Sequence, residues 1–168
     1  MIIGNGSLAR MLNDRKEFIF FASGISNSGM DNQTYWTNEK YREISLLTYY
    51  IKESSDFDFM FVYFSTISKF YNDSPYVKHK NEMEMVIREL TDNYCIINLG
   101  NIYGDTNPNT FINFIRAKQA KGEPVEIRDE YKFMISKDQL LFITDNLPLK
   151  GKHEISVFGE MRKVNDLI

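Results

Sequence analysis

The chain is poor in the residues that build disulfides and metal centres. It contains a single cysteine, Cys95, and only two histidines, His79 and His153. One cysteine excludes an internal disulfide and a zinc site made of cysteines, and two histidines argue against a histidine-built centre, so no metal site is expected. Cys95 lies in an apolar stretch and is expected in the core. His79 falls off the apolar stripe of its predicted helix and is expected to be exposed.

Excess positive charge and long apolar runs are also missing. The formal net charge is −3, which argues against the concentrated basic face that nucleic-acid binding needs. No stretch approaches the ~20 apolar residues of a membrane span. The opening Met1-Ile2-Ile3-Gly4 lacks the basic start and long apolar stretch of a signal peptide. We therefore expect a cytoplasmic protein without nucleic-acid or membrane partners.

What the chain does contain is an alternation of short apolar runs and helical stripes. Its 168 residues are 43% hydrophobic and suit a single domain with a substantial core. Fully apolar runs are typical of strands buried on both faces, as in a parallel sheet, and the intervening stripes predict helices that cross over it. Strands are predicted at residues 1–3, 18–22, 57–64 and 95–99, with weaker ones at 125–128 and 153–158.

The predicted helices share an i, i+3, i+4 apolar spacing. They cover residues 8–12, 41–51, a segment that begins at Ser74-Pro75, a segment near 111–115 that Gly122 ends, and 139–143. Residues 23–38 are rich in Gly, Ser and Asn and are predicted to form a loop. The fold class is therefore α/β, and ligands are expected at the carboxyl ends of the strands.

The first of these strand ends carries a glycine pattern. Gly4-Asn5-Gly6-Ser7-Leu8-Ala9 follows the G-x-G-x-x-A spacing, in which one glycine allows a tight turn and another lets a phosphate approach the backbone. An ordinary glycine turn remains the alternative. The acidic residue that usually binds the adenosine ribose is missing, because the second strand ends in Ala22-Ser23-Gly24 without an Asp or Glu.

The third strand and the helix after it carry a second group of residues. Tyr76 and Lys80 are one helical turn apart, on the same stripe as the apolar positions, where an unpartnered lysine is costly. Lys78 and the acidic Glu82 and Glu84 are assigned to the solvated side. An ammonium beside a phenol favours the phenolate, so Tyr76 is expected to exchange a proton near neutral pH, with the Thr66 hydroxyl holding a substrate oxygen.

Together these stretches resemble the extended short-chain dehydrogenase/reductase family, the NAD-dependent sugar epimerases and dehydratases. The resemblance implies a Rossmann-type fold, Tyr76 as proton donor and acceptor, Lys80 as its electrostatic partner, and Thr66 as the third member. It also implies a nucleotide-sugar substrate and a homodimer. The stretches that carry it are IGNGSLA (residues 3–9), FFASGISNS (20–28), YFSTIS (63–68), Tyr76-x-x-x-Lys80 and INLGNIYG (97–104).

The resemblance extends to cofactor and substrate contacts. The cofactor would be NAD or NADP, and the substrate contacts would come from Asn101, Tyr103 and Lys132. Residues 1–104 would form the core with the glycine loop and Tyr-Lys motif, and 105–168 a shortened substrate-binding portion of the same domain. The implied cofactor contacts are Gly4, Asn5, Gly6, Ser7, Leu8, Ala22, Ser23, Gly24, Ser65, Lys80 and Asn101.

The same resemblance predicts a truncated sheet. In the family several elements separate the glycine loop from the segment that Ala22-Ser23-Gly24 resembles, whereas here one predicted helix does so. The second and third strands of the Rossmann-type sheet, which carry the adenosine-binding half, are therefore expected to be absent. The fold expected from the whole sequence is a truncated Rossmann-type parallel sheet flanked by helices.

Two other functions remain open from the residues alone. The first is a reduced relative that binds a nucleotide sugar or a partner protein without redox turnover, which the missing ribose acid favours. The second is a flavodoxin-like mononucleotide binder, which a small parallel sheet with an anion-binding first loop also fits.

Overall fold

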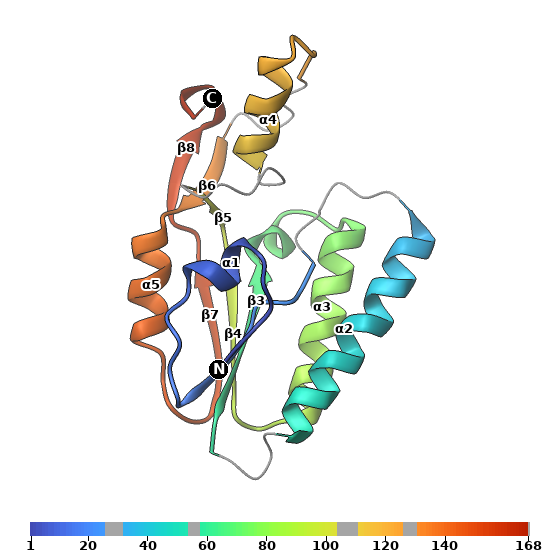
Figure 1. The fold of residues 1–168 in the computed structure, drawn as a ribbon, viewed down its shortest axis with the longest axis vertical. Helices are drawn as coiled ribbons and strands as arrows, with labels where there is room; N and C mark the ends of the chain where they lie inside the picture. Colours follow the sequence, from blue (N-terminus) through green and yellow to red (C-terminus); the bar gives the residue numbers. More distant parts are fainter. Residues whose placement is uncertain (26–31, 54–57, 104–110, 126–130, 168) are drawn as a thin grey trace.

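The protein folds as two sheets with helices around them (Figure 1). The computed structural model describes residues 1–25, 32–53, 58–103, 111–125 and 131–167. The main sheet has five parallel strands in the order β1-β2-β3-β4-β7. Their bounds are β1 (Ile2–Ile3), β2 (Phe18–Phe21), β3 (Met60–Thr66), β4 (Tyr94–Leu99) and β7 (Lys152–Val157). The expected α/β class with a parallel sheet is thus confirmed.

The second sheet lies beyond the carboxyl ends of the main strands, at the top of Figure 1. β5 (Asn101–Ile102) pairs with β6 (Tyr131–Ile135) in parallel, and β6 pairs with β8 (Glu160–Lys163) in antiparallel. The chain passes between the sheets at Gly100, where a Cβ would come within 2.7 Å of a backbone oxygen. This close approach requires glycine at that position.

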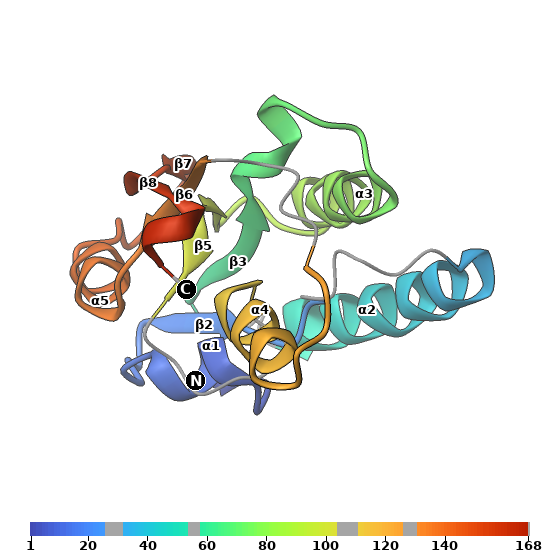
Figure 2. The same cartoon turned by 90° about the horizontal axis from the view of Figure 1, so that it is seen from above.

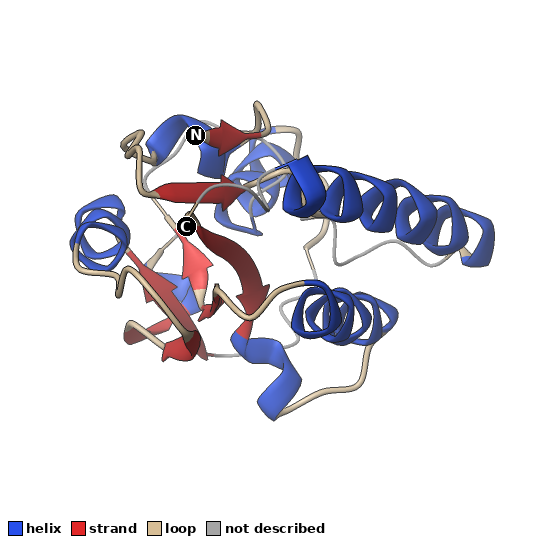
Figure 3. Ribbon diagram, turned by 90° about the horizontal axis from the view of Figure 1, so that it is seen from below, coloured by secondary structure: helices blue, strands red, loops and turns tan. Residues whose placement is uncertain are grey.

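Helices cover both faces of the main sheet. Figure 2 and Figure 3 show α2 (Gln33–Glu53) and α3 (Pro75–Leu90) lying together on one side, with α5 (Lys137–Asp145) on the other. One buried cluster joins α2 and α3 to the sheet, and a second joins α1 (Ser7–Met11) and α5 to its opposite face. The remaining elements are α4 (Phe111–Ala120) and the short 3-10 helices η1 (Ile67–Phe70) and η2 (Val164–Asp166).

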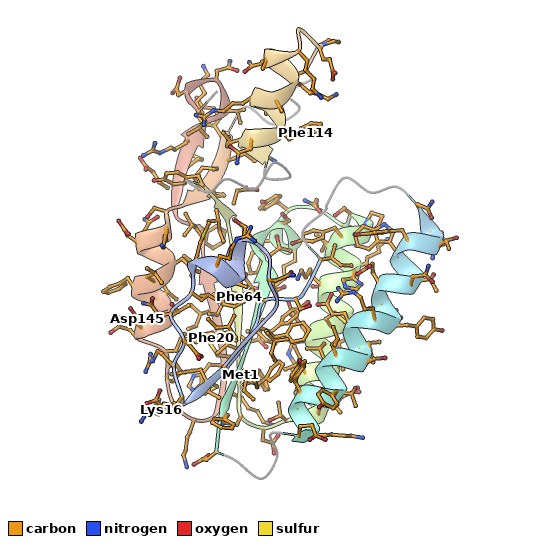
Figure 4. The ribbon with its side chains drawn as sticks, in the orientation of Figure 1. Met1, Lys16, Phe20, Phe64, Phe114 and Asp145 are labelled. Atoms are coloured by element: carbon orange, nitrogen blue, oxygen red, sulfur yellow. The ribbon has the colours of Figure 1, made fainter. Side chains whose placement is uncertain are left out.

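The apolar runs form strands because each of their faces has a helix to bury it. All of β2, β3 and β4 is buried. Phe20 and Phe64 point into the α1/α5 side of the core with ring centroids 6.4 Å apart (Figure 4). Phe21 and Tyr63 point to the α2/α3 side, with ring centroids 6.1 Å apart. Cys95 is buried, as expected.

β1 is the edge strand of the main sheet as far as the chain is described. Among the described residues β1 pairs with β2 alone, and only α1 connects the two strands. The described part of the sheet therefore has no strand beyond β1 that could support an adenosine. This topology agrees with the expected absence of two strands between the glycine loop and residues 22–24.

Several local expectations are confirmed. Ser74 caps α3 by accepting a hydrogen bond from the Val77 N–H at 3.3 Å, and Pro75 occupies the first turn. Gly122 lies two residues after α4 with φ +68°, as a C-terminal cap requires.

Other expectations were wrong at the level of elements. Residues 33–38, predicted as loop, form the first turns of α2, because Asn32 Oδ1 accepts from the Tyr35 N–H at 3.0 Å and buried Trp36 packs against His79. Strands β6 and β8 were not predicted. The strand expected at 125–128 falls mostly outside the described residues.

Over the described part of the chain, no helix has both the length and the apolar character needed to cross a membrane.

Candidate active site

The candidate site lies where β3 ends and α3 begins. Thr66 is the last residue of β3, and its hydroxyl oxygen accepts from the Ser68 N–H at 3.1 Å, which caps η1 and fixes the side chain at the strand end. Tyr76 is the second residue of α3 and is half-buried. The side chain of Thr66 acts on Tyr76, whose pKa it lowers. Two of the three predicted catalytic residues therefore lie near each other.

Lys80 is buried against the same strand, with only 3% of its surface exposed. Its ammonium donates to the Tyr63 hydroxyl at 3.2 Å and to the Phe64 carbonyl oxygen at 3.0 Å. It lies 5.9 Å from the centroid of the Tyr76 ring. Lys78, two residues earlier, is 63% exposed and pairs with Asp73, as expected for a solvated lysine. The expected placement of Lys80 on the core-facing side is confirmed.

A buried carboxylate that the sequence did not indicate lies next to Lys80. Glu43 on α2 has no exposed surface and accepts from the Tyr63 hydroxyl at 2.7 Å. Its second oxygen lies 2.8 Å from His79 Nε2. The expectation that His79 is exposed is therefore wrong: α2 packs beside α3 and covers that side of the helix, where Glu43 gives the imidazole a partner.

The position predicted for Glu84 was wrong as well. This carboxylate is buried, accepts from Ser65 Oγ at 2.5 Å and pairs with Lys69 and Arg88, each at 2.9 Å. Two cations and one hydroxyl donor thus compensate its burial. Glu82 keeps its expected exposed position and pairs with Lys40 at 3.1 Å.

The electrostatics of Tyr76 correct another expectation. Burial raises the pKa of Tyr76 above its ordinary value, and the negative charge of Glu43 raises it further, while the Thr66 side chain lowers it. The net effect is a raised pKa, so Tyr76 keeps its proton at neutral pH. The phenolate near neutral pH predicted from the Tyr76–Lys80 spacing is therefore not supported.

Glu43 and Lys80 perturb each other in the directions expected of opposite charges. Burial alone would raise the pKa of Glu43, but Lys80, His79 and Tyr63 hold it below its ordinary value. Burial lowers the pKa of Lys80, and the carboxylates of Glu43 and Glu84 oppose that fall. Glu43 is thus held as a carboxylate.

The glycine loop lies beside the end of β2. Gly4 has φ +124°, and a Cβ there would come within 2.5 Å of the Ala22 carbonyl oxygen, so only glycine fits. At Gly6 a Cβ would meet nothing within 4 Å, and Asn5 and Gly6 are exposed. Ser7 begins the five-residue helix α1, in which Leu8 packs against the core. The loop therefore leaves open space for an approaching group.

Residues 22–24 connect this loop to Lys80. Ala22 N–H donates to the Ile3 carbonyl oxygen at 2.8 Å, and the Ser23 carbonyl oxygen accepts from Arg42 at 3.0 Å. A Cβ on Gly24 would lie 2.8 Å from Lys80 Nζ and 3.0 Å from Glu43 Oε1. The predicted cofactor residues Gly4 to Leu8, Ala22 to Gly24 and Lys80 thus form a continuous region.

Four other predicted contacts lie elsewhere. Ser65 turns toward α3, where its hydroxyl donates to Glu84. Asn101 is on β5 and donates to the Phe133 carbonyl oxygen at 3.3 Å. Tyr103 follows β5, with the Arg162 guanidinium 5.5 Å from its ring centroid, and Lys132 on β6 is paired in register with Arg162. Asn101, Tyr103 and Lys132 therefore belong to the second sheet.

Several solved enzyme structures share this fold. The enzyme WbmG of Bordetella bronchiseptica, solved with NAD and UDP, superposes with a TM-score of 0.67 at 12% identity over 89% of this chain and 53% of its own. The ADP-L-glycero-D-manno-heptose-6-epimerase of Helicobacter pylori gives 0.65 at 11% identity over 90% of this chain and 56% of its own.

A third structure is similar. The dTDP-glucose 4,6-dehydratase of Bacillus anthracis, in complex with NAD, gives a TM-score of 0.59 at 10% identity over 82% of this chain and 52% of its own. The chain thus spans about half the length of these structures. No protein-family profile and no curated protein matches the sequence. The resemblance to the extended short-chain dehydrogenases/reductases is confirmed at the level of the fold.

Proposed function

We propose that the protein is an NAD(P)-dependent oxidoreductase of the epimerase or dehydratase kind that acts on a nucleotide sugar. The observation that carries the proposal is the group at the end of β3, where the Thr66 side chain acts on Tyr76 and the buried ammonium of Lys80 lies 5.9 Å from the centroid of the tyrosine ring. A buried lysine at a strand end, beside a phenol and a hydroxyl, matches the needs of proton transfer at a carbinol or carbonyl oxygen.

The proposed roles follow from the chemistry of each side chain. Tyr76 holds its proton at neutral pH, so it would donate that proton to a substrate carbonyl oxygen as the oxygen becomes an alcohol. Thr66 would hydrogen-bond the same oxygen and orient it. Lys80 would stabilise the phenolate that remains once the proton has left, because its ammonium is fixed nearby.

The residues present fit one end of a dinucleotide. Gly6 leaves room beside the first loop, Gly24 brings the backbone against Lys80, and two of the three ammonium hydrogens of Lys80 have acceptors among the described residues. These residues would hold the nicotinamide end, and the cofactor would supply the hydride when bound. In the described part of the chain, residues 22–25 after β2 include no carboxylate and no strand lies beyond β1, so binding of the adenosine end would differ from the usual arrangement.

The substrate class is the less direct part of the proposal. WbmG was solved with UDP, and the epimerase and dehydratase named above act on sugar nucleotides. Asn101, Tyr103 and Lys132 on the second sheet are the proposed sugar contacts. A homodimer through α2 and α3 is proposed as well, since Tyr41, Tyr49 and Met85 on these helices expose more than half of their surface.

The function is tested by incubating the protein with NAD or NADH and UDP-, dTDP- and ADP-linked sugars and following the sugar by NMR. Conversion of at least one substrate is expected in the wild type and in Glu82→Gln, which changes an exposed residue of the same helix. We expect its loss in Tyr76→Phe, which removes the proton donor. Equal conversion in Tyr76→Phe and the wild type would refute the assigned role.

One observation favours a second function. Among the described residues the sheet has no strand beyond β1 to support an adenosine, so the chain would also suit a relative that binds a nucleotide sugar or a partner protein without redox turnover. In that case Tyr76→Phe would leave the binding of a UDP-sugar unchanged, and no NAD would bind. Calorimetry with each ligand separates the two functions.

A further inference from the structure

Four buried side chains from three elements form one continuous hydrogen-bond chain next to Tyr76. Lys80 on α3 donates to Tyr63 on β3 at 3.2 Å, and Tyr63 donates to Glu43 on α2 at 2.7 Å. Glu43 is joined to His79 on α3 at 2.8 Å. None of the four is more than 3% exposed. Water therefore does not screen the charges in this chain.

The chemistry of the groups fixes the direction of each bond. An ammonium only donates and a carboxylate only accepts, so the single hydroxyl hydrogen of Tyr63 must point to Glu43 while its oxygen accepts from Lys80. Glu43 thus orients the hydroxyl that holds the ammonium. The Phe64 carbonyl oxygen accepts a second ammonium hydrogen at 3.0 Å.

Glu43 is also the carboxylate that compensates the positive charge of Lys80. The other carboxylate that acts on Lys80 is Glu84, which already pairs with Lys69 and Arg88. The cation that opposes Lys80 is Arg42, which is held by Glu39 and by the Ser23 carbonyl oxygen.

Glu43 also contacts His79 and the Ile25 N–H, the latter at 3.4 Å. Among the described residues, no lysine or arginine other than Lys80 is therefore its counter-charge. His79 Nδ1 is buried and has no hydrogen-bond partner in the described part of the chain. The imidazole therefore anchors Glu43 through Nε2 alone.

We propose that Glu43 is a positioning residue for the Tyr76–Lys80 pair: through Tyr63 it fixes the buried ammonium beside Tyr76 and compensates its charge. This inference rests on the proposed function of that pair. Charged or titratable groups that act on Tyr76 are Glu43 from α2, Tyr71 from the segment after η1, and Lys80 from its own helix. Of these, Glu43 alone is a buried anion.

The proposal is tested by the ionisation of Tyr76, without cofactor or substrate. Phenolate absorbance is titrated in the wild type and in Glu43→Gln, and the same titration with Tyr76→Phe added is subtracted from each. The Tyr76 signal should begin at a pH lower by about one unit in Glu43→Gln, because one nearby negative charge is gone while the ammonium stays. Glu82→Gln, which removes an exposed carboxylate of α3, should leave it unchanged.

A second measurement tests the proposal even if Glu43→Gln folds poorly. Urea unfolding is compared for Glu43→Gln, Lys80→Met and the double variant. Each single change leaves one buried charge uncompensated, so the combined loss in urea midpoint should be smaller than the sum of the two single losses. Additive losses, or a Tyr76 signal that begins at the same or a higher pH in Glu43→Gln, would overturn the proposal.

These results separate the inference from the function on which it rests. A shifted Tyr76 signal and non-additive losses support the role of Glu43 even if no sugar is converted. In that case the proposed reaction fails and the positioning of the pair does not. Conversion of a sugar together with an unshifted Tyr76 signal would retain the reaction and reject the role of Glu43.

Discussion

Removing the Tyr63 hydroxyl tests how much the buried chain contributes to stability. In Tyr63→Phe the ring keeps its place between Phe21 and the helices, but Lys80 loses an acceptor and Glu43 loses a donor. Both lost bonds involve charged, fully buried partners, for which the net contribution is ~1.5–3 kcal/mol each. The remaining contacts of Lys80 and Glu43 compensate in part, so we expect a loss of about 2–4 kcal/mol in the free energy of unfolding.

The assay is urea unfolding with a matched control. Tyr41→Phe removes a hydroxyl from a tyrosine of α2 that is 67% exposed, and it should change the free energy of unfolding by less than ~0.5 kcal/mol. For a domain of this size, the expected loss in Tyr63→Phe corresponds to a decrease in Tm of roughly 5–12 °C. A Tyr63→Phe protein as stable as the Tyr41→Phe control would refute the assignment of a strong buried chain.

Three further outcomes are expected, each measurable by urea unfolding. Gly4→Ala should lose at least ~1–3 kcal/mol, because φ is +124° and the new Cβ would meet the Ala22 oxygen, whereas Gly6→Ala, with open space, should lose far less. The pKa of Glu43 is lower in the folded than in the unfolded protein, where it is near ~4.3, so ionised Glu43 stabilises the fold above that pH. This stabilisation is lost as the pH falls through the pKa of the folded state. Glu43→Gln should therefore make stability depend less on pH on the acid side. The raised pKa of Tyr76 makes stability fall as pH rises above its unfolded value near ~10, and Tyr76→Phe should reduce that alkaline loss.

Local periodicity predicted those parts of the site that lie on one element or on adjacent ones. The register of Lys80 with the apolar positions of its helix correctly placed it in the core. The apolar runs correctly predicted the parallel strands, because each is buried on both faces. The end of β3 could then be recognised as the place where Thr66 meets the helix.

Contacts between distant segments could not be predicted in the same way. Glu43 and His79 are 36 residues apart and meet only because α2 and α3 pack side by side. The apolar stripe of a helix identifies the one face that packs on the sheet. When a second helix packs beside the first, it also buries residues about 100° around the helix from that stripe. The same cause explains why the proton affinity of Tyr76 was misjudged when Lys80 alone was considered and Glu43 on α2 was not. Glu84 is buried for a different reason: it lies four residues after Lys80, about 40° around the helix, and it pairs with Ser65 on β3 and Lys69 on η1.

The most direct test of the proposed site is calorimetric titration of the wild type and Lys80→Met with NADH. We expect saturable binding to the wild type at or below millimolar cofactor and weaker binding to Lys80→Met. Lys78→Met, at an exposed lysine of the same helix, should behave as the wild type. Absence of binding to the wild type at millimolar NADH, or equal binding to Lys80→Met, would contradict the proposed site.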